Sequence, residues 1–133
     1  MDGPLALIFG LGLDIIEVPR MARNLARTAG LKTRLFTERE IAYCESKKRS
    51  EEHYAARFAA KEAFLKALGT GWRDGLRFAD IEIVNDERGR PGLAVYGRVK
   101  DFCEANGIAG MHVSLSHLKE TAAAVVVLEK IAE

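Results

Sequence analysis

The chain has 133 residues, enough for one domain with a modest core, and we expect residues 1–133 to form a single domain. Its 20 Lys and Arg residues against 19 Asp and Glu leave a formal net charge of +1, which argues against a general nucleic-acid binder. With 48% hydrophobic and 29% charged residues, the composition is that of a folded globule and excludes an intrinsically disordered chain.

The first part of the chain predicts a strand followed by a helix. Residues 5–13 form a short segment rich in aliphatic side chains, which is typical of a buried strand. Pro19 suits the first turn of a helix, because an amide hydrogen there would have no helical partner. We expect this helix to run to about Ala29, with Gly30 as its C-terminal stop.

Two further helices are predicted in the middle of the chain. Thr37 and Glu40 match a capping box, so a helix should begin directly after Thr37. Residues 51–68 are rich in alanine and contain neither proline nor glycine, which predicts a long helix. Phe58, Leu65 and Leu68 would mark its apolar stripe.

The last part of the chain predicts two hairpins separated by a short helix. Residues 80–84 and 93–97 flank the turn sequence NDERG, and residues 111–116 and 121–129 form a second strand pair. Residues 99–105 would form the helix between them. This order favours an α+β fold in which helices pack on one face of an antiparallel sheet.

No targeting or metal-scaffold signal is visible. Cys44 and Cys103 stand alone without a CxxC motif, which argues against a disulfide framework and fits a reducing compartment. The apolar stretch LALIFGLGLDII is broken by two glycines and Asp14, and Asp2 stands where a signal peptide carries basic residues. We therefore expect a cytoplasmic protein without a membrane partner.

Asp14 follows the first predicted strand and has two interpretations. A carboxylate at the end of a buried strand is costly unless a cation or donor pairs with it, so Asp14 is a candidate ligand. The alternative is an ordinary aspartate that caps the helix beginning near Pro19.

Glu62 and Lys66 are one turn apart on the long helix. Such a pair is commonly a surface device for helix stability, worth only about 0.2–0.5 kcal/mol. Here it stands near Arg57 and Lys61 and leads into the GTG sequence of residues 69–71, a set of cations and flexible backbone that can hold a phosphate. Two carboxylates meeting a phosphate would suit Mg²⁺.

The segment HVSLSH and the first helix carry the remaining candidates. Ser114 and Ser116 lack the surroundings of a nucleophilic serine, and a serine ladder at the edge of the core is the better interpretation. His117, beside a turn, is better placed to contact a ligand, and the alternative is a structural histidine. One face of the first predicted helix carries Arg20, Arg23 and Arg27. This face is either a solvated basic patch or a docking surface for an acidic partner.

Three segments together resemble the holo-acyl-carrier-protein synthase family of phosphopantetheinyl transferases. They are GLGLDIIEVPR, RFAAKEAFLKALGTG and HVSLSHLKETAAAVVVLE, in the order and at the spacing of the family motifs. The resemblance covers essentially the whole chain. Its short length resembles the compact bacterial group, whose enzymes form homotrimers with coenzyme A bound between subunits.

The resemblance implies a role for each matching residue. Asp14 and Glu62 would bind Mg²⁺, Glu62 and Lys66 would be catalytic, and Arg20, Arg23 and Arg27 would dock an acidic apo acyl carrier protein. The implied coenzyme A contacts come from two neighbouring subunits, one giving Lys66 and Gly69 and the other giving Arg49, Arg57, Gly89, Arg90, Pro91, Ser116 and His117.

The implied reaction moves the 4′-phosphopantetheine group of coenzyme A to a carrier serine in fatty-acid biosynthesis and releases adenosine 3′,5′-bisphosphate. At phosphorus, an enzyme contributes mainly positioning and charge neutralisation. Mn²⁺ can replace Mg²⁺, since both suit oxygen ligands. Two alternatives remain open: a coenzyme A sensor without turnover, and a protein-interaction module that uses only the arginine face.

Overall fold

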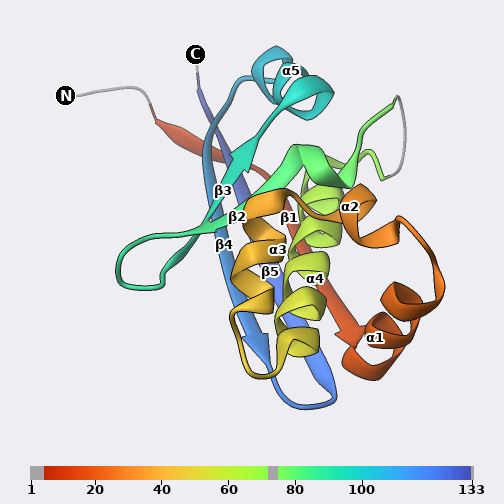
Figure 1. Cartoon of the computed structure of the whole chain (residues 1–133). Helices are drawn as coiled ribbons and strands as arrows, with labels where there is room; N and C mark the ends of the chain where they lie inside the picture. Colours follow the sequence, from red (N-terminus) through yellow and green to blue (C-terminus); the bar gives the residue numbers. More distant parts are fainter. Residues whose placement is uncertain (1–4, 72–74, 133) are drawn as a thin grey trace.

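The computed structural model describes residues 5–71 and 75–132 of the chain (Figure 1). In chain order its elements are β1 (Ala6–Glu17), α1 (Val18–Arg27), α2 (Leu31–Leu35), α3 (Glu38–Glu45), α4 (Ser50–Leu68), the 3₁₀ turn η1 (Phe78–Asp80), β2 (Ile81–Asn85), β3 (Pro91–Val95), α5 (Gly97–Ala105), β4 (Ile108–His117) and β5 (Thr121–Ile131). Within the described residues, every helix is too short or too polar to cross a bilayer.

The three long strands form an antiparallel sheet in the order β1-β5-β4. The last strand of the chain is therefore central, and its Ala124 lies between Asp14 of β1 and Leu115 of β4. Helix α4 runs along one face of this sheet, with α1 and α3 on either side of it (Figure 1). The predicted α+β architecture, with helices on one sheet face, is confirmed.

Strands β2 and β3 form a separate two-stranded hairpin whose register runs from Ile81 opposite Val95 to Asn85 opposite Pro91. The hairpin lies alongside β4, and its turn projects away from the helices (Figure 1). This confirms the first predicted hairpin, with one difference. Gly97 begins α5 instead of ending the strand, because its φ of 54° breaks the extended backbone.

The helix starts follow the sequence signals. Pro19 lies in the first turn of α1, and the Thr37–Glu40 capping box at the start of α3 is complete. Strand β1 is longer than predicted and continues through Asp14 to Glu17, which is the N-terminal cap residue of α1. Asp14 therefore does not cap this helix, and that interpretation was wrong.

Helix α4 is buried on nearly all sides, which differs from the single apolar stripe that the sequence predicted. Leu65 and Leu68 are buried as expected, whereas Phe58 remains partly exposed. The helix contacts β1, β5, α1, α3 and β2, and its alanines let these elements approach closely. Two of its basic residues, Arg57 and Lys61, are consequently buried.

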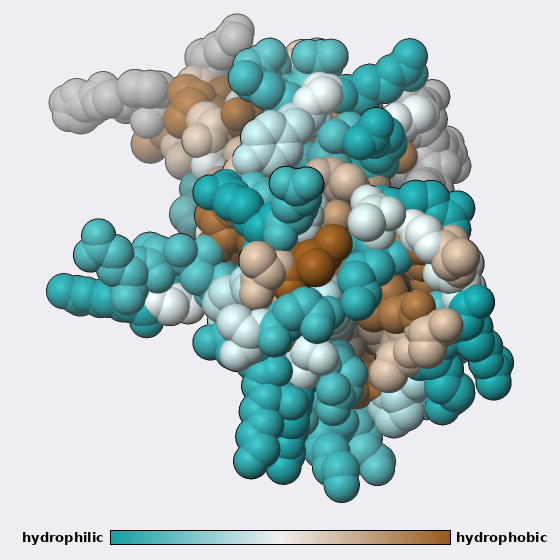
Figure 2. Space-filling view, viewed as in Figure 1, coloured by the Kyte–Doolittle hydropathy of each residue, from teal (hydrophilic) through white to brown (hydrophobic). Residues whose placement is uncertain are grey.

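The sheet face opposite α4 remains open and apolar along β1. Leu11, Leu13 and Ile15 are 65%, 59% and 63% exposed, so the strand predicted as buried has an exposed outer face. Their neighbours on β5 are aliphatic, whereas β4 presents polar side chains on the same face. By contrast, hydrophilic side chains cover most of the helical side, with smaller apolar areas between them (Figure 2).

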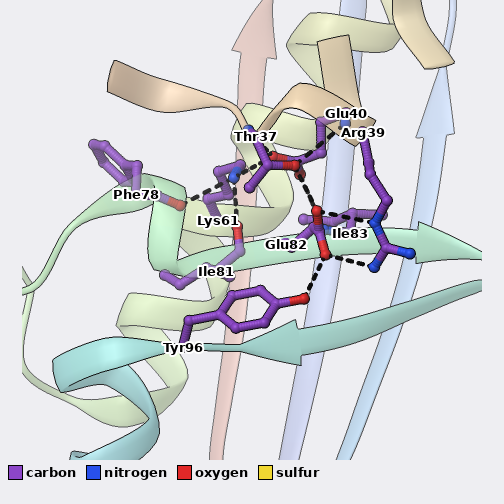
Figure 3. Close-up of polar contacts among 9 residues, drawn as sticks. All are labelled: Thr37, Arg39, Glu40, Lys61, Phe78, Ile81, Glu82, Ile83 and Tyr96. Atoms are coloured by element: carbon purple, nitrogen blue, oxygen red, sulfur yellow. Dashed lines mark hydrogen bonds and ion pairs between the residues drawn. The ribbon is translucent and has the colours of Figure 1, made fainter. Parts of the chain in front are cut away.

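The carboxylate of Glu82 in β2 is buried (Figure 3). It accepts hydrogen bonds from the Thr37 hydroxyl at 2.5 Å, the Arg39 guanidinium at 2.8 Å and the Tyr96 hydroxyl at 2.8 Å. Burial alone would raise its pKa, but hydrogen bonds from Arg39, Thr37 and Tyr96 together lower the pKa to about 2. The carboxylate thus joins the start of α3 to the β2–β3 hairpin.

We expect Glu82→Gln to lower the free energy of unfolding at pH 7 by up to about 3 kcal/mol. The folded pKa lies below the ordinary value of 4.5, so the charged group stabilises the protein above pH 4.5 and this contribution is lost as the pH falls toward 2. In urea denaturation, the free energy of unfolding should therefore fall less between pH 7 and pH 3 in the variant than in the wild type. The exposed Glu87→Gln change is the control, and a variant that follows the wild type at both pH values would contradict the prediction.

Candidate active site

The Asp14 side chain projects from β1 toward α4. Its Oδ1 accepts a hydrogen bond from Lys66 Nζ at 2.9 Å, and the same ammonium donates to the Leu13 carbonyl at 3.0 Å. Lys66 therefore pairs with a strand residue 52 positions away rather than serving only as a helix-surface partner of Glu62. Residues far apart in the sequence meet here as predicted.

Glu62 is partly buried on the side of α4 that faces β1 and α1. Its pKa is raised, first by burial and then by the charge of Asp14, while the Lys66 ammonium acts in the opposite direction. The electrostatic influence of Asp14 means that the two carboxylates lie close together. Two like charges in a partly buried site form an electronegative pair that attracts a cation.

The Asp14–Glu62 pair fits a hard divalent cation. Asp14 Oδ2 is buried and has no hydrogen-bond partner among the described residues. In that part of the chain, no group of three or more His, Cys, Asp or Glu side chains is gathered as for a full protein cage. Two carboxylate ligands suit Mg²⁺, which usually keeps several waters and binds substrate phosphates.

Two glycines bring Asp14 close to Glu62. A Cβ on Gly12 would lie 1.8 Å from the carbonyl oxygen of Ala63, and one on Gly10 would lie 1.8 Å from that of Ala67. Only glycine allows the backbones of β1 and α4 to approach this far. The GLGLD sequence therefore sets the separation between the strand and the helix that carry the two carboxylates.

A hollow of about 320 Å³ opens beside Glu62, between β1, α1 and α4. Its wall includes Arg20 and Met21 of α1 and Phe58 of α4. Arg20 also borders a second hollow together with Arg23, whereas Arg27 lies in the last turn of α1, and all three guanidiniums are exposed. The basic face of α1 thus begins at the edge of the carboxylate pair.

His117, at the end of β4, belongs to a second cluster near the start of α4. Its Nδ1 lies 2.9 Å from Glu52 Oε1, and its ring packs edge-on against His53 with centroids 4.9 Å apart. Arg49 donates to the other Glu52 oxygen at 3.4 Å. The His117 hydrogen bond is the main reason that the pKa of Glu52 is lowered, and burial lowers the pKa of His53.

Arg57 lies next to this cluster but is not a free cation. It is 2% exposed, donates to Asn85 Oδ1 at 2.5 Å and stacks over the Tyr43 ring at 3.9 Å. Of the three cations that the sequence places on α4 near a phosphate, Arg57 and Lys61 are buried and Lys66 is exposed, because α4 is packed on the sides that carry the first two. Arg57 Nε remains buried without a partner among the described residues.

The β2–β3 turn lies on the same side of α4 as Arg57. Asn85 Nδ2 donates to the Gly89 carbonyl at 3.0 Å, and Asp86 Oδ1 accepts from the backbone N–H of Arg90 at 2.9 Å. Gly89 has φ of 84°, a conformation that glycine adopts most readily. Pro91 begins β3, so the predicted Gly89–Arg90–Pro91 contacts sit on a turn built by its own polar side chains.

The predicted site residues fall into two groups on opposite sides of α4. Glu62 and Arg57 are five residues apart, which corresponds to about 140° around a helix. Asp14, Glu62 and Lys66 form the first group, and Gly69 ends α4 nearby with φ of 81°. The second group contains the Arg57 and His117 clusters and the turn, with Ser116 exposed on β4. One chain does not bring the two groups together.

Sequence analysis missed three polar residues of the second group. Glu52 and His53 contact His117, and Asn85 holds Arg57. The helical spacing of His53 and Arg57 is a signal that could have placed both on one face. The contacts with Asn85 and His117 join segments far apart in sequence and have no local signal.

Residues 10–126 match the family model of the 4′-phosphopantetheinyl transferase superfamily. The chain belongs to this superfamily. It is 49% identical over 125 residues to a holo-[acyl-carrier-protein] synthase of Geobacter sp. strain M21, which covers 93% of this chain and 100% of the relative. These matches confirm the family resemblance of the three motifs.

Solved structures of the same family superpose on nearly the whole chain. The synthase of Neisseria meningitidis has a TM-score of 0.85 at 34% identity and covers 93% of this chain and 100% of its own. The synthase of Bacillus anthracis, solved in complex with CoA (3′,5′-ADP), has a TM-score of 0.75 at 41% identity, with 92% and 97% covered. This chain therefore has the same fold as the solved holo-[acyl-carrier-protein] synthases.

Proposed function

We propose that this chain is a holo-[acyl-carrier-protein] synthase. It transfers 4′-phosphopantetheine from coenzyme A to the serine hydroxyl of an apo acyl carrier protein, a step that serves fatty-acid biosynthesis. The serine oxygen forms the new bond to phosphorus, the bond to adenosine 3′,5′-bisphosphate breaks, and the serine proton is lost. The observation that carries the proposal is the Asp14–Glu62–Lys66 group within a family match that spans residues 10–126.

Asp14 and Glu62 are the proposed ligands of Mg²⁺, or of Mn²⁺ in its place. When bound, the ion neutralises charge on the diphosphate and on the leaving group. Lys66 would hold a phosphate oxygen, since its side chain is 56% exposed while its ammonium contacts Asp14. We assign to Glu62 a second role as acceptor of the serine proton, because it is a partly buried carboxylate at the edge of the hollow beside α1.

The proposed coenzyme A contacts are Lys66 and Gly69 on one side of α4 and, on the other, Arg49, Arg57, Gly89, Arg90, Pro91, Ser116 and His117. Because the two sides face away from each other in one chain, we propose that a site is completed by a neighbouring subunit. The acidic carrier would dock on Arg20, Arg23 and Arg27 of α1, of which Arg20 lines the hollow at Glu62.

Mass spectrometry of an apo carrier tests the proposed reaction directly. Incubation with coenzyme A and Mg²⁺ should add the phosphopantetheine mass to the carrier serine, and a chelator should prevent the gain. A folded protein that modifies none of several carriers would contradict the proposal. If coenzyme A binds equally well with and without Mg²⁺ and no transfer occurs, a coenzyme A sensor is favoured instead.

We propose a homotrimer of single-domain chains, residues 1–133 each, packed through the open sheet face. The support is the exposed aliphatic row of Leu11, Leu13 and Ile15 on β1, a surface that a lone chain leaves in water. A cytoplasmic location completes the proposal, since both thiols, Cys44 and Cys103, are unpaired.

We expect Leu11→Glu to break this assembly, because a charge buried in an apolar interface is strongly unfavourable. Light scattering coupled to gel filtration should show a threefold fall in mass from the wild type. Transfer should fall with it, because the site needs a neighbour. Leu118→Glu, at a leucine in the β4–β5 turn that is also exposed, is the control. A trimer that persists in Leu11→Glu would rule out this face as the interface.

A further inference from the structure

Lys61 forms a buried ion pair that the proposed chemistry does not use (Figure 3). Its side chain is fully buried, and Nζ lies 2.7 Å from Glu40 Oε1. The same ammonium donates to the carbonyl of Phe78 at 3.0 Å and to that of Ile81. Three donor positions of one cation are thereby used on three different segments of the chain.

Glu40 is also fully engaged. Its Oε2 accepts from the Ile83 N–H at 2.9 Å, and its Oε1 accepts from the Thr37 N–H at 3.0 Å as part of the capping box. The carboxylate is 1% exposed. The pair Lys61–Glu40 thus ties α4 to the start of α3, to η1 and to β2 in one connected set of hydrogen bonds (Figure 3).

Stability alone is a poor reason for such a pair. Burial lowers the pKa of Lys61, and the charge and hydrogen bond of Glu40 act in the opposite direction. Well-packed apolar residues of similar volume often stabilise a protein as much as a buried ion pair or more. Unlike an apolar contact, the ion pair has directional hydrogen bonds. It therefore fixes the rotation of α4 about its axis and its position along that axis.

The position of Lys61 in α4 makes that direction matter for the site. Consecutive residues are about 100° apart around a helix, so Lys61 faces β2 while Glu62 faces β1 and α1. A rotation or slide of α4 that displaced Lys61 would displace Glu62 relative to Asp14. One turn earlier, Arg57 holds Asn85 of the same hairpin, whose turn carries the proposed coenzyme contacts.

We propose that Lys61, through Glu40, is a positioning residue that fixes the rotation and height of α4, so that Glu62 meets Asp14 and the β2–β3 hairpin keeps its place. This inference rests on the proposed function. It assigns Lys61 no contact with substrate. Its effect is to hold a ligand carboxylate on one side of α4 and the hairpin on the other in a single geometry.

The test replaces both charges at once. Lys61→Met alone leaves the Glu40 carboxylate buried and unpaired, and should largely abolish folding. The double variant Glu40→Gln/Lys61→Met has no buried charge and should still fold, with a lower melting temperature because the Phe78 and Ile81 carbonyls lose their donor. It should nevertheless bind Mn²⁺ at least tenfold more weakly, measured by electron paramagnetic resonance in the presence of coenzyme A. In transfer assays the Mg²⁺ concentration for half-maximal rate should rise in parallel.

A matched control uses the same substitutions on an exposed ion pair. Lys32 Nζ lies 3.1 Å from Glu45 Oε2 away from the proposed site, and Glu45→Gln/Lys32→Met should leave the metal requirement unchanged. A loss of folded protein alone would lower the maximal rate without changing the Mg²⁺ requirement. Only misplacement of Glu62 raises that requirement.

If the double variant fails to fold, the variant Glu40→Asp tests the inference in its place. It keeps both charges but shortens the carboxylate by one methylene, and it should raise the Mn²⁺ dissociation constant at least threefold. A folded double variant or a folded Glu40→Asp that binds Mn²⁺ like the wild type would overturn the inference. Absence of transfer by the wild type would instead overturn the proposed function, which is a separate result.

Discussion

Glu62→Gln is expected to reduce the rate of phosphopantetheine transfer by at least about 100-fold, because loss of a residue that merely supports a metal ligand already costs about 10–100-fold. The variant keeps the size of the side chain and removes one of two carboxylates that would hold the cation. The measurement is the rate of mass gain on the apo carrier at saturating coenzyme A and Mg²⁺.

The same variant should not lose stability. The pKa of Glu62 is raised in the folded state, so ionisation of this carboxyl at neutral pH opposes folding, and a neutral amide removes that opposition. Thermal denaturation should therefore give a melting temperature equal to or above that of the wild type. Glu51→Gln, at an exposed position in the first turn of α4, is the matched control. Retained transfer by Glu62→Gln would remove Glu62 from the metal role.

Gly12→Ala is expected to lower the free energy of unfolding by about 3 kcal/mol or more, at the upper end of overpacking effects. The added Cβ would lie 1.8 Å from the Ala63 carbonyl oxygen and 3.0 Å from the Ala67 nitrogen. Both are backbone atoms of α4, so no side chain can rotate away. The helix must move off β1, which also separates Glu62 from Asp14.

Urea denaturation measures this effect, and Gly92→Ala is the matched control. Gly92 is also a strand glycine, and its added Cβ would meet only ordinary contacts, the nearest being Val84 Cγ2 at 3.8 Å. Among Gly12→Ala molecules that remain folded, the Mg²⁺ requirement for transfer should rise. A Gly12→Ala midpoint equal to that of Gly92→Ala would show that the close approach of β1 and α4 is not required.

The elements with strong local signals were predictable. The capping box fixed the start of α3, Pro19 marked the start of α1, and the NDERG turn located the first hairpin. These signals act within a few residues, because they satisfy free N–H groups or favour particular backbone angles. Asp14, Glu62 and Lys66 were found because their motifs resemble a family, and the structure brings the three together.

Other features had no local signal. Helical periodicity predicts one buried stripe, but α4 contacts elements on nearly every side, so Arg57 and Lys61 are enclosed. Likewise, an aliphatic run predicts burial without saying which face is covered, and β1 keeps its outer face exposed.

The amino-acid sequence by itself determined the order of the strands and of the longer helices, the α+β class and, through its motifs, the family and the reaction, whereas α2 and η1 were not predicted. Only the tertiary structure decided which charged groups on α4 are available to a ligand. A pattern along the chain records the periodicity of one helix, whereas burial depends on neighbours that arrive from distant segments. For that reason Glu62 and Lys66 remain accessible, while Lys61, directly before Glu62 in the sequence, is held in the core by its ion pair with Glu40.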